Sequence, residues 1–303
     1  MRHRFEFVLF QLLKWSVLML PLRSAQRTGR FLGGAAYRFM RSRREIALDN
    51  LRHAFPEKSE RELRRVAQGA FRNYGITFVE FLWFPNLTPE RLRALVRIRN
   101  PELIRGAATG GKGVVFLSGH FGNWELNAYA TGALADIRFV IIVQTQNNPY
   151  VDVVINRHRC QAGSRIVPMG MAVREIVRTL DRGGAVAIAP DQSAAKESIY
   201  VEFFGRRVST HQGPAVFSLR SGAPLVMGFI IRQPDGTYEI VFEDIPREDI
   251  LEYTEEHVAE LTRRHTAILE SYIRRYPDHW LWMHRRWKHV REGPDPAAGG
   301  SPG

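Results

Sequence analysis

Cysteine is nearly absent from this chain of 303 residues, in which Cys160 stands alone. A single cysteine cannot form a disulfide within the chain, which fits a reducing compartment. A nucleophilic thiol needs a nearby base, and His158, two residues away in sequence, is a poor guide to geometry. Cys160 is therefore interpreted as a buried or incidental thiol rather than as a nucleophile.

Several motifs that define common classes of protein are also missing. The sequence has no zinc-finger spacing, no RNP-type motif and no dense lysine tract, so nucleic acid is not an expected partner. It has no Gly-x-Ser-x-Gly nucleophile elbow and no internal repeat. Five histidines gather in the C-terminal part without ligand-like spacing, which makes a metal site the weakest functional alternative. They are His257, His265, His279, His284 and His289.

Acidic residues are too few to balance the basic ones. The chain has 43 Lys and Arg against 31 Asp and Glu, a formal net charge of +12. A positive surplus concentrates polyanions near the surface, and arginine forks bind phosphate with two hydrogen bonds. An anionic membrane surface or a phosphate-rich ligand is therefore favoured. The basic positions expected to meet anionic lipid or an acidic protein surface are Arg2, Arg4, Arg41, Arg43 and Arg44.

The N-terminal residues 5–22 are rich in Leu, Phe, Val and Met, but Glu6 and Lys14 interrupt them. A secretory signal would have an uncharged core and a small-residue cleavage site, and neither is present. A helix of this length rises about 27 Å, which is marginal for a hydrocarbon core of ~30 Å. Residues 1–30 are therefore interpreted as an anchor helix that lies in the membrane or barely crosses it. The alternative is a buried core helix.

The rest of the chain divides into a helical region, an α/β region and a tail. Residues 31–110 have a helical pattern, in which Ser59 and Glu62 form a capping box. In residues 111–290 short apolar runs alternate with amphipathic segments, which predicts an α/β fold with a mainly parallel central sheet flanked by helices. The tail, residues 291–303, is rich in Gly, Pro and Ala and is expected to be disordered.

The expected strands and helices of the α/β region can be placed from these runs. Strands are predicted at residues 114–117, 139–143, 165–167, 185–189, 225–231 and 238–242. Helices are predicted at residues 124–134, 151–161, 173–181, 213–221 and 254–276. A turn at residues 233–237 predicts that the last two strands are antiparallel neighbours.

The segment Ser118-Gly-His-Phe-Gly-Asn-Trp-Glu125 follows the first predicted strand, at the end where open α/β sheets place their sites. Within one regular helix, positions five apart would be ~140° out of phase. His120 and Glu125 can therefore meet only if His120 precedes the helix. A histidine oriented by a carboxylate is a general base, and without a nucleophile elbow it would activate a substrate hydroxyl directly. A structural His–Glu pair remains the alternative.

The turn after His120 is expected to supply backbone N–H groups that hold the oxyanion of an attacked thioester. The turn residues in question are Gly119, Phe121, Gly122 and Asn123.

Further polar residues follow later strands and turns. Asp191 ends an apolar strand, where a carboxylate is costly unless paired, so it is expected to form an ion pair that shapes the site. Arg159 is expected to hold phosphate or to pair with Asp191, unless it is a surface arginine. Arg206 and Arg207 follow a glycine turn and either grip phosphates or remain solvated.

The C-terminal stretch 280–288 alternates tryptophans with basic residues. Such a pattern suits a belt at the level of lipid headgroups. Packing of the tryptophans inside the fold is the alternative. The tryptophans are Trp280, Trp282 and Trp287.

Taken in order, these segments resemble the lipid A biosynthesis acyltransferases, the lauroyl and myristoyl transferase family within the lysophospholipid acyltransferase superfamily. The resemblance covers nearly the whole chain. The family motif of His, four residues and an acidic residue is filled by His120 and Glu125. The later matches are Arg159, Asp191-Gln192, Phe203-Phe204-Gly205, Thr210, Gly213-Pro214, Gly222-Ala223-Pro224 and the aromatic-basic residues 280–288.

The resemblance implies a glycerolphosphate acyltransferase-like fold and transfer of a fatty acyl chain to a glycolipid hydroxyl, most often of a lipid A precursor. The donor it implies is an acyl carrier protein thioester, or less often coenzyme A, at the cytoplasmic face of the inner membrane. No other cofactor and no metal is expected. The substrate-binding residues that we expect are Arg159, Asp191, Gln192, Arg206, Arg207 and Thr210.

One position departs from the family pattern. Many members carry a third acidic residue after Asp-Gln, where this chain has Ser193. The difference bears on donor or acceptor contacts rather than on the catalytic pair. Three alternatives stay open: acylation of another glycolipid or a phospholipid such as phosphatidylinositol mannoside, a lipid or thioester hydrolase, and a non-catalytic membrane-binding protein.

Overall fold

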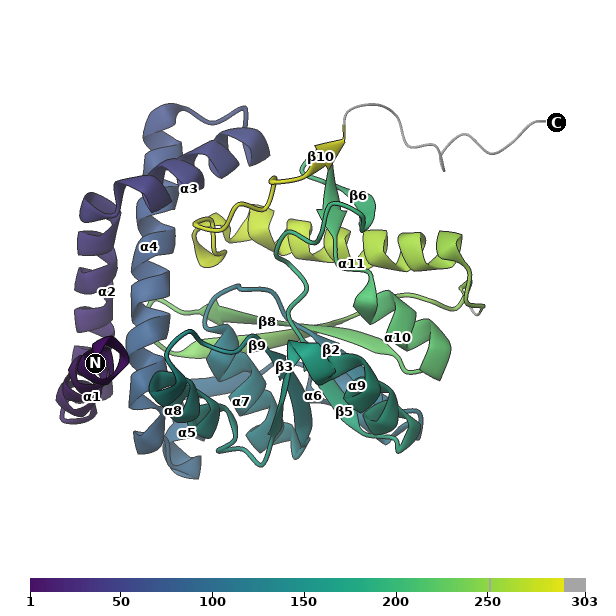
Figure 1. Ribbon diagram of the computed structural model, residues 1–303, viewed down its shortest axis with the longest axis horizontal. Helices are drawn as coiled ribbons and strands as arrows, with labels where there is room; N and C mark the ends of the chain where they lie inside the picture. Colours follow the sequence, from purple (N-terminus) through teal and green to yellow (C-terminus); the bar gives the residue numbers. More distant parts are fainter. Residues whose placement is uncertain (251, 292–303) are drawn as a thin grey trace.

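The computed structural model describes residues 1–250 and 252–291 and consists of an N-terminal set of helices packed on an α/β region (Figure 1). The tail that we expect to be disordered lies, from residue 292 on, outside the described residues. The N-terminal helices are α1 (Arg2–Leu18), α2 (Leu22–Phe39), α3 (Arg41–Ala54) and α4 (Glu60–Trp83). The predicted capping box is confirmed, because Ser59 and Glu62 exchange hydrogen bonds at the start of α4.

The remaining elements alternate between helix and strand. The helices are η1 (Phe84–Asn86), α5 (Pro89–Leu95), α6 (Pro101–Thr109), α7 (Trp124–Ala135), α8 (Pro149–Arg159), η2 (Met169–Met171), α9 (Ala172–Asp181), α10 (Gly213–Ser221), α11 (Glu255–Arg275) and η3 (Pro277–His279). The strands are β1 (Val96–Ile98), β2 (Val114–Leu117), β3 (Phe139–Val143), β4 (Arg165–Pro168), β5 (Ala185–Ile188), β6 (Ile199–Phe203), β7 (Arg206–Thr210), β8 (Leu225–Arg232), β9 (Tyr238–Asp244) and β10 (Val290–Arg291).

The central sheet has seven strands in the order β1-β9-β8-β2-β5-β3-β4. Strands β8, β2, β5, β3 and β4 run parallel, whereas β9 is antiparallel to β8 across the turn at residues 233–237. The predicted α/β fold with a mainly parallel sheet is thus confirmed. The sequence analysis did not predict β1, or the small antiparallel sheet of β10, β7 and β6.

Both faces of the central sheet are covered, because its inner strands are apolar on both sides. Val115 and Leu117 of β2 face one core, which α11 covers with Leu261 and Ile273. The alternate residues of β2 face a second core, which includes residues of α5, α6 and α7. This two-sided burial explains why β2 reads as an uninterrupted apolar run.

The N-terminal apolar segment does not form one continuous helix. α1 ends at Leu18, and Pro21 caps the start of α2, since proline disfavours a helical conformation in the residue before it. Two hydrogen bonds hold this corner: Trp83 Nε1 donates to the Leu20 carbonyl (2.9 Å) and Asn86 Nδ2 donates to the Leu18 carbonyl (3.0 Å). Within the two described ranges, no helix has the length and apolar character that crossing a bilayer requires.

The C-terminal tryptophans are packed inside the protein. Trp280 and Trp282 are buried, and Trp287 stacks on Phe203 with ring centroids 5.4 Å apart. The expected belt at headgroup level is therefore wrong, and the packing alternative is confirmed. The reason is that this stretch crosses back over the turn that follows β2, where Phe121 pairs with Trp280 in a β-bridge.

Candidate active site

The site is built where β2 and β5 end side by side. These strands are parallel neighbours with Leu117 opposite Ile188, so their carboxyl ends meet at one edge of the sheet. His120 follows β2 by three residues and Asp191 follows β5 by three residues. The topology thus brings together two side chains that lie 71 positions apart in sequence.

Asp191 is buried and accepts three hydrogen bonds. Its Oδ1 lies 2.7 Å from His120 Nδ1, and its Oδ2 accepts from the His120 backbone N–H at 2.7 Å. Trp280 Nε1 donates to the same Oδ2 at 2.9 Å. Because the carboxylate accepts, Nδ1 of His120 carries the proton. The lone pair of Nε2 is left on the other side of the ring, where Gln192 Nε2 lies 3.4 Å away.

The charges of this pair stabilise each other. Burial favours the protonated form of Asp191, but the charge of His120 and hydrogen bonds from His120 and Trp280 hold the pKa of Asp191 at about 2. Burial also disfavours a charged His120, yet the charge of Asp191 and its hydrogen bond outweigh this and raise the pKa of His120. His120 is therefore a stronger base than an ordinary buried imidazole.

Glu125 does not hold His120 as the sequence analysis expected. It lies in the first turn of α7 and accepts two hydrogen bonds from Arg159 at the end of α8, one of them from Nε at 2.9 Å. Among the alternatives given for Arg159, pairing with Asp191 is wrong, since Asp191 pairs with His120 and Arg159 pairs with Glu125. Glu125 still lies close enough for its charge to raise the pKa of His120.

Residues 119–123 form the turn that carries His120, here named the catalytic turn. A hydrogen bond from its backbone and close packing against β8 hold this turn in place. The Gly122 N–H donates to the His279 carbonyl at 2.7 Å, so in this structure it is not available to an oxyanion. Gly122 has φ +58°, and a Cβ atom there would lie 2.1 Å from the Ile230 carbonyl oxygen, which only glycine avoids. Phe121 is buried, and Asn123 caps α7 by accepting the Leu126 N–H at 3.0 Å.

The remaining predicted substrate-binding residues, Thr210, Arg206 and Arg207, lie on β7. Thr210 is buried in β7, where its Oγ1 accepts from Arg286 Nη2 at 2.7 Å. Arg206 and Arg207 begin the same strand, with Arg206 exposed and Arg207 half-buried. Cys160 is exposed just after α8, so of the two interpretations, a buried or an incidental thiol, the buried one is wrong.

The sequence analysis missed two aromatic neighbours of the site. Trp280 bonds Asp191, and the ring of Trp124 lies 5.0 Å from that of His120. Trp124 in turn stacks on Tyr74 of α4. No spacing rule connects these positions. The available signal was the density of tryptophan around residues 280–288, which we attributed to a membrane belt.

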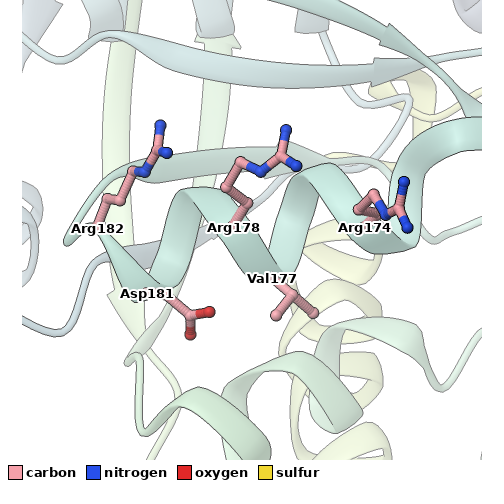
Figure 2. A pocket seen from close by; sticks show the side chains of 5 residues that line it. All are labelled: Arg174, Val177, Arg178, Asp181 and Arg182. Carbon is pink, nitrogen blue, oxygen red and sulfur yellow. The ribbon is translucent and has the colours of Figure 1, made fainter.

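Among the described residues, no three His, Cys, Asp or Glu side chains come together in a way that would hold a metal ion. A hollow of about 460 Å³ lies over α9 and is lined by residues away from the catalytic turn (Figure 2). Figure 2 shows Arg174, Arg178 and Arg182 on one side of this helix, on successive turns. This hollow contains none of the predicted site residues.

The fold and the site together define an α/β enzyme with a histidine, paired to a buried aspartate, at the carboxyl end of a parallel strand. Residues 2–289 match the sequence model of the family described as Bacterial lipid A biosynthesis acyltransferase. The chain therefore belongs to this family, and it is an acyltransferase.

Individual relatives agree with the family assignment. The chain is 27% identical over 284 residues to the lipid A biosynthesis lauroyltransferase of Escherichia coli (strain K12), covering 92% of this chain and 90% of the relative. It is 28% identical to the lipid A biosynthesis palmitoleoyltransferase of the same organism, over 90% and 88% of the two chains. The lipid A biosynthesis myristoyltransferase of the same organism is 25% identical, over 88% of this chain and 80% of the relative.

Proposed function

We propose that this acyltransferase moves a fatty acyl chain from the thioester of an acyl carrier protein, or of coenzyme A, to a hydroxyl of a lipid A precursor. The observation that carries the proposal is the hydrogen bond between His120 Nδ1 and Asp191, because it leaves Nε2 as the base. The family membership and the names of the relatives support the acceptor class.

In the proposed reaction His120 Nε2 takes the proton of the acceptor hydroxyl. The resulting alkoxide oxygen forms a bond to the thioester carbonyl carbon, and the carbon–sulfur bond breaks. The thiolate then receives the proton from His120, so the products are an ester and a free thiol. Asp191 stabilises the imidazolium while it exists, in the orienting role that the sequence analysis gave to Glu125.

Glu125 has a different proposed role, as a second negative charge beside the imidazolium. Its two hydrogen bonds with Arg159 fix the carboxylate at the start of α7. Because its charge raises the pKa of His120, we propose that Glu125 helps to stabilise the protonated state formed during transfer. Arg159 then acts on the reaction by holding Glu125 rather than by holding a phosphate.

We place the reaction at the cytoplasmic face of the inner membrane. α1 carries large apolar side chains that are exposed along one side, and α8, which packs against α1, adds two more. These residues are Phe5, Val8, Leu9, Leu12 and Trp15 on α1, Met19 directly after it, and Tyr150 and Val153 on α8. α8 also ends at Arg159, which pairs with Glu125, so an element that contributes to these exposed apolar residues also reaches the site. Such a surface suits partial insertion into a leaflet.

The deciding experiment gives purified protein a lipid A precursor together with acyl carrier protein thioester or coenzyme A thioester, and follows the products by mass spectrometry. We expect acylated lipid and free thiol in equal amounts, and no acylated lipid from His120→Ala. Free fatty acid without acylated lipid would instead identify a hydrolase. Acylation of another glycolipid or a phospholipid in preference to the lipid A precursor would overturn the proposed acceptor.

A further inference from the structure

Glu80 is a charged residue inside the protein that the proposed chemistry does not use. It lies on α4, is 3% exposed, and is surrounded by hydrogen-bond donors from several elements. The donors are Gln26 Nε2 (2.8 Å), Asn123 Nδ2 (2.7 Å), Arg232 Nη1 (3.1 Å), Arg232 Nη2 (3.4 Å) and Tyr238 OH (2.5 Å). Three segments far apart in sequence, namely α2, the start of α7 and the β8–β9 hairpin, therefore converge on one carboxylate of α4.

Stability alone is a poor account of this network. Arg232, whose side chain is 8% exposed, is the ion-pair partner of Glu80. Both charged groups of a buried ion pair lose their hydration, so the pair is often no more stabilising than well-packed apolar residues of the same volume. Its best-supported advantage is that it fixes one arrangement of the groups around it. The groups fixed here include the turn that carries His120.

The connection runs through the start of α7. Asn123 uses its Oδ1 to cap this helix at Leu126, and its Nδ2 donates to Glu80. One turn earlier on α4, Thr77 Oγ1 donates to the Gly122 carbonyl at 3.1 Å. α4 thus holds two consecutive residues, Gly122 and Asn123, that lie between His120 and Glu125.

We infer that Glu80 is a positioning residue for acyl transfer: its carboxylate fixes Asn123, and through it the placement of His120 relative to Glu125. The inference rests on the proposed function, because it concerns the same base. Glu80 touches neither side chain itself, so its effect passes through the backbone of the turn. A displacement of about 1 Å at a reacting group can cost on the order of a hundredfold in rate.

The test reverses the polarity of the Glu80–Asn123 hydrogen bond. Glu80→Gln removes the charge and replaces one of the two acceptor oxygens with an NH2 donor, so the surrounding donors can no longer all be accepted. Asn123→Asp keeps the α7 cap but places a second carboxylate against Glu80. In the double variant the two side chains match again, because the amide introduced on α4 donates to the carboxylate introduced before α7. The Tyr238 hydroxyl is able to accept instead of donate there.

We expect each single variant to lower kcat at least tenfold with KM changed less than about twofold, and the double variant to recover kcat to within about threefold of wild type. A matched control is Gln26→Leu, which removes a donor to the same carboxylate on the side away from the turn. It is expected to lower the unfolding temperature while kcat stays within about twofold.

Two results would overturn the inference. One is unchanged kcat in Glu80→Gln, and the other is a double variant no better than the worse single variant. Circular dichroism measures the fraction of each single variant that is folded. Dividing the rate by the concentration of folded protein then gives a kcat that a loss of folding does not affect. An inactive wild-type protein would contradict the proposed function instead, so the two failures are distinguishable.

Discussion

At the scale of single residues, the contact between His120 and Asp191 decides what the site can do. The carboxylate binds both the ring and the backbone of His120, so the imidazole cannot rotate without losing its bond to Asp191. The sequence indicated that Asp191 must be paired but not with which residue. The pairing depends on the order β2-β5 in the sheet, which local pattern does not contain.

A first prediction concerns the pH dependence of activity. The charge of Asp191 raises the pKa of His120, so Asp191→Asn should lower that pKa and move the acid limb of kcat/KM to lower pH. The plateau rate should fall about 10²- to 10⁴-fold, because the amide no longer stabilises the imidazolium. Asp181→Asn, an exposed aspartate on α9, is the control and should leave the profile unchanged. An acid limb that does not move in Asp191→Asn would show that another group titrates.

A second prediction concerns stability. The pKa of Asp191 falls from 3.8 to about 2 on folding, so its contribution is present above about pH 4 and is lost as the pH falls towards 2. The raised pKa of His120 has the opposite sign: its contribution is complete below about pH 6.5 and is lost as the pH rises through the folded-state pKa. The difference in unfolding free energy between wild type and Asp191→Asn should therefore be largest between about pH 4 and 6.5.

Urea unfolding followed by tryptophan fluorescence at constant ionic strength measures this difference. At the acid end it should shrink by roughly 2 kcal/mol, the value of a shift of nearly two pKa units. A difference that stays constant from pH 6 to pH 2 would contradict an ionised, paired Asp191.

At the scale of elements, α4 connects the N-terminal helices to the catalytic turn. Figure 1 shows α2 and α4 lying side by side along one end of the sheet. They approach so closely because glycines face each other: a Cβ at Gly33 would lie 2.2 Å from the Phe71 carbonyl oxygen, and one at Gly75 would lie 2.3 Å from the Gly29 carbonyl oxygen. The helical pattern of both segments was readable in the sequence, whereas this contact was not.

A third prediction compares two adjacent glycines of α2. Gly33→Ala would push its Cβ into the backbone of α4 and should lower the unfolding free energy by about 1–3 kcal/mol. At Gly34 the nearest atom to a Cβ is 3.9 Å away, so Gly34→Ala should be neutral or stabilising by up to ~1 kcal/mol. Urea unfolding of both variants measures the contrast. Equal effects would show that the two helices do not pack through Gly33.

At the scale of the whole molecule, exposed apolar side chains gather at the N-terminal helix of a basic protein. The exposed apolar side of α1 lies in a protein with a net charge of +12. Figure 1 shows α1 at the lower left of the molecule and β10 at the top, away from α1. Attachment through α1 would therefore leave β10 outside the membrane contact.

A fourth prediction follows for membrane binding. Leu12→Glu combined with Trp15→Glu should lower partitioning onto anionic vesicles at least tenfold. Both side chains are exposed in the protein, and moving an apolar side chain of this size from water into lipid is worth about 1.5–3 kcal/mol. Val290→Glu, which changes an exposed apolar residue on β10, is the control and should bind as wild type does. Vesicle sedimentation at two salt concentrations measures the effect. Equal binding of the double variant and wild type would remove α1 from the membrane contact.

The sequence by itself determined the fold class, the position of most elements, the family resemblance and His120 as the candidate base, because these depend on local periodicity and on short motifs. Only the tertiary structure decided the partners. It paired Asp191 with His120, Arg159 with Glu125, and Glu80 with the catalytic turn. The physical reason is that a buried charge must be paired, but its partner is set by which strands and helices become neighbours.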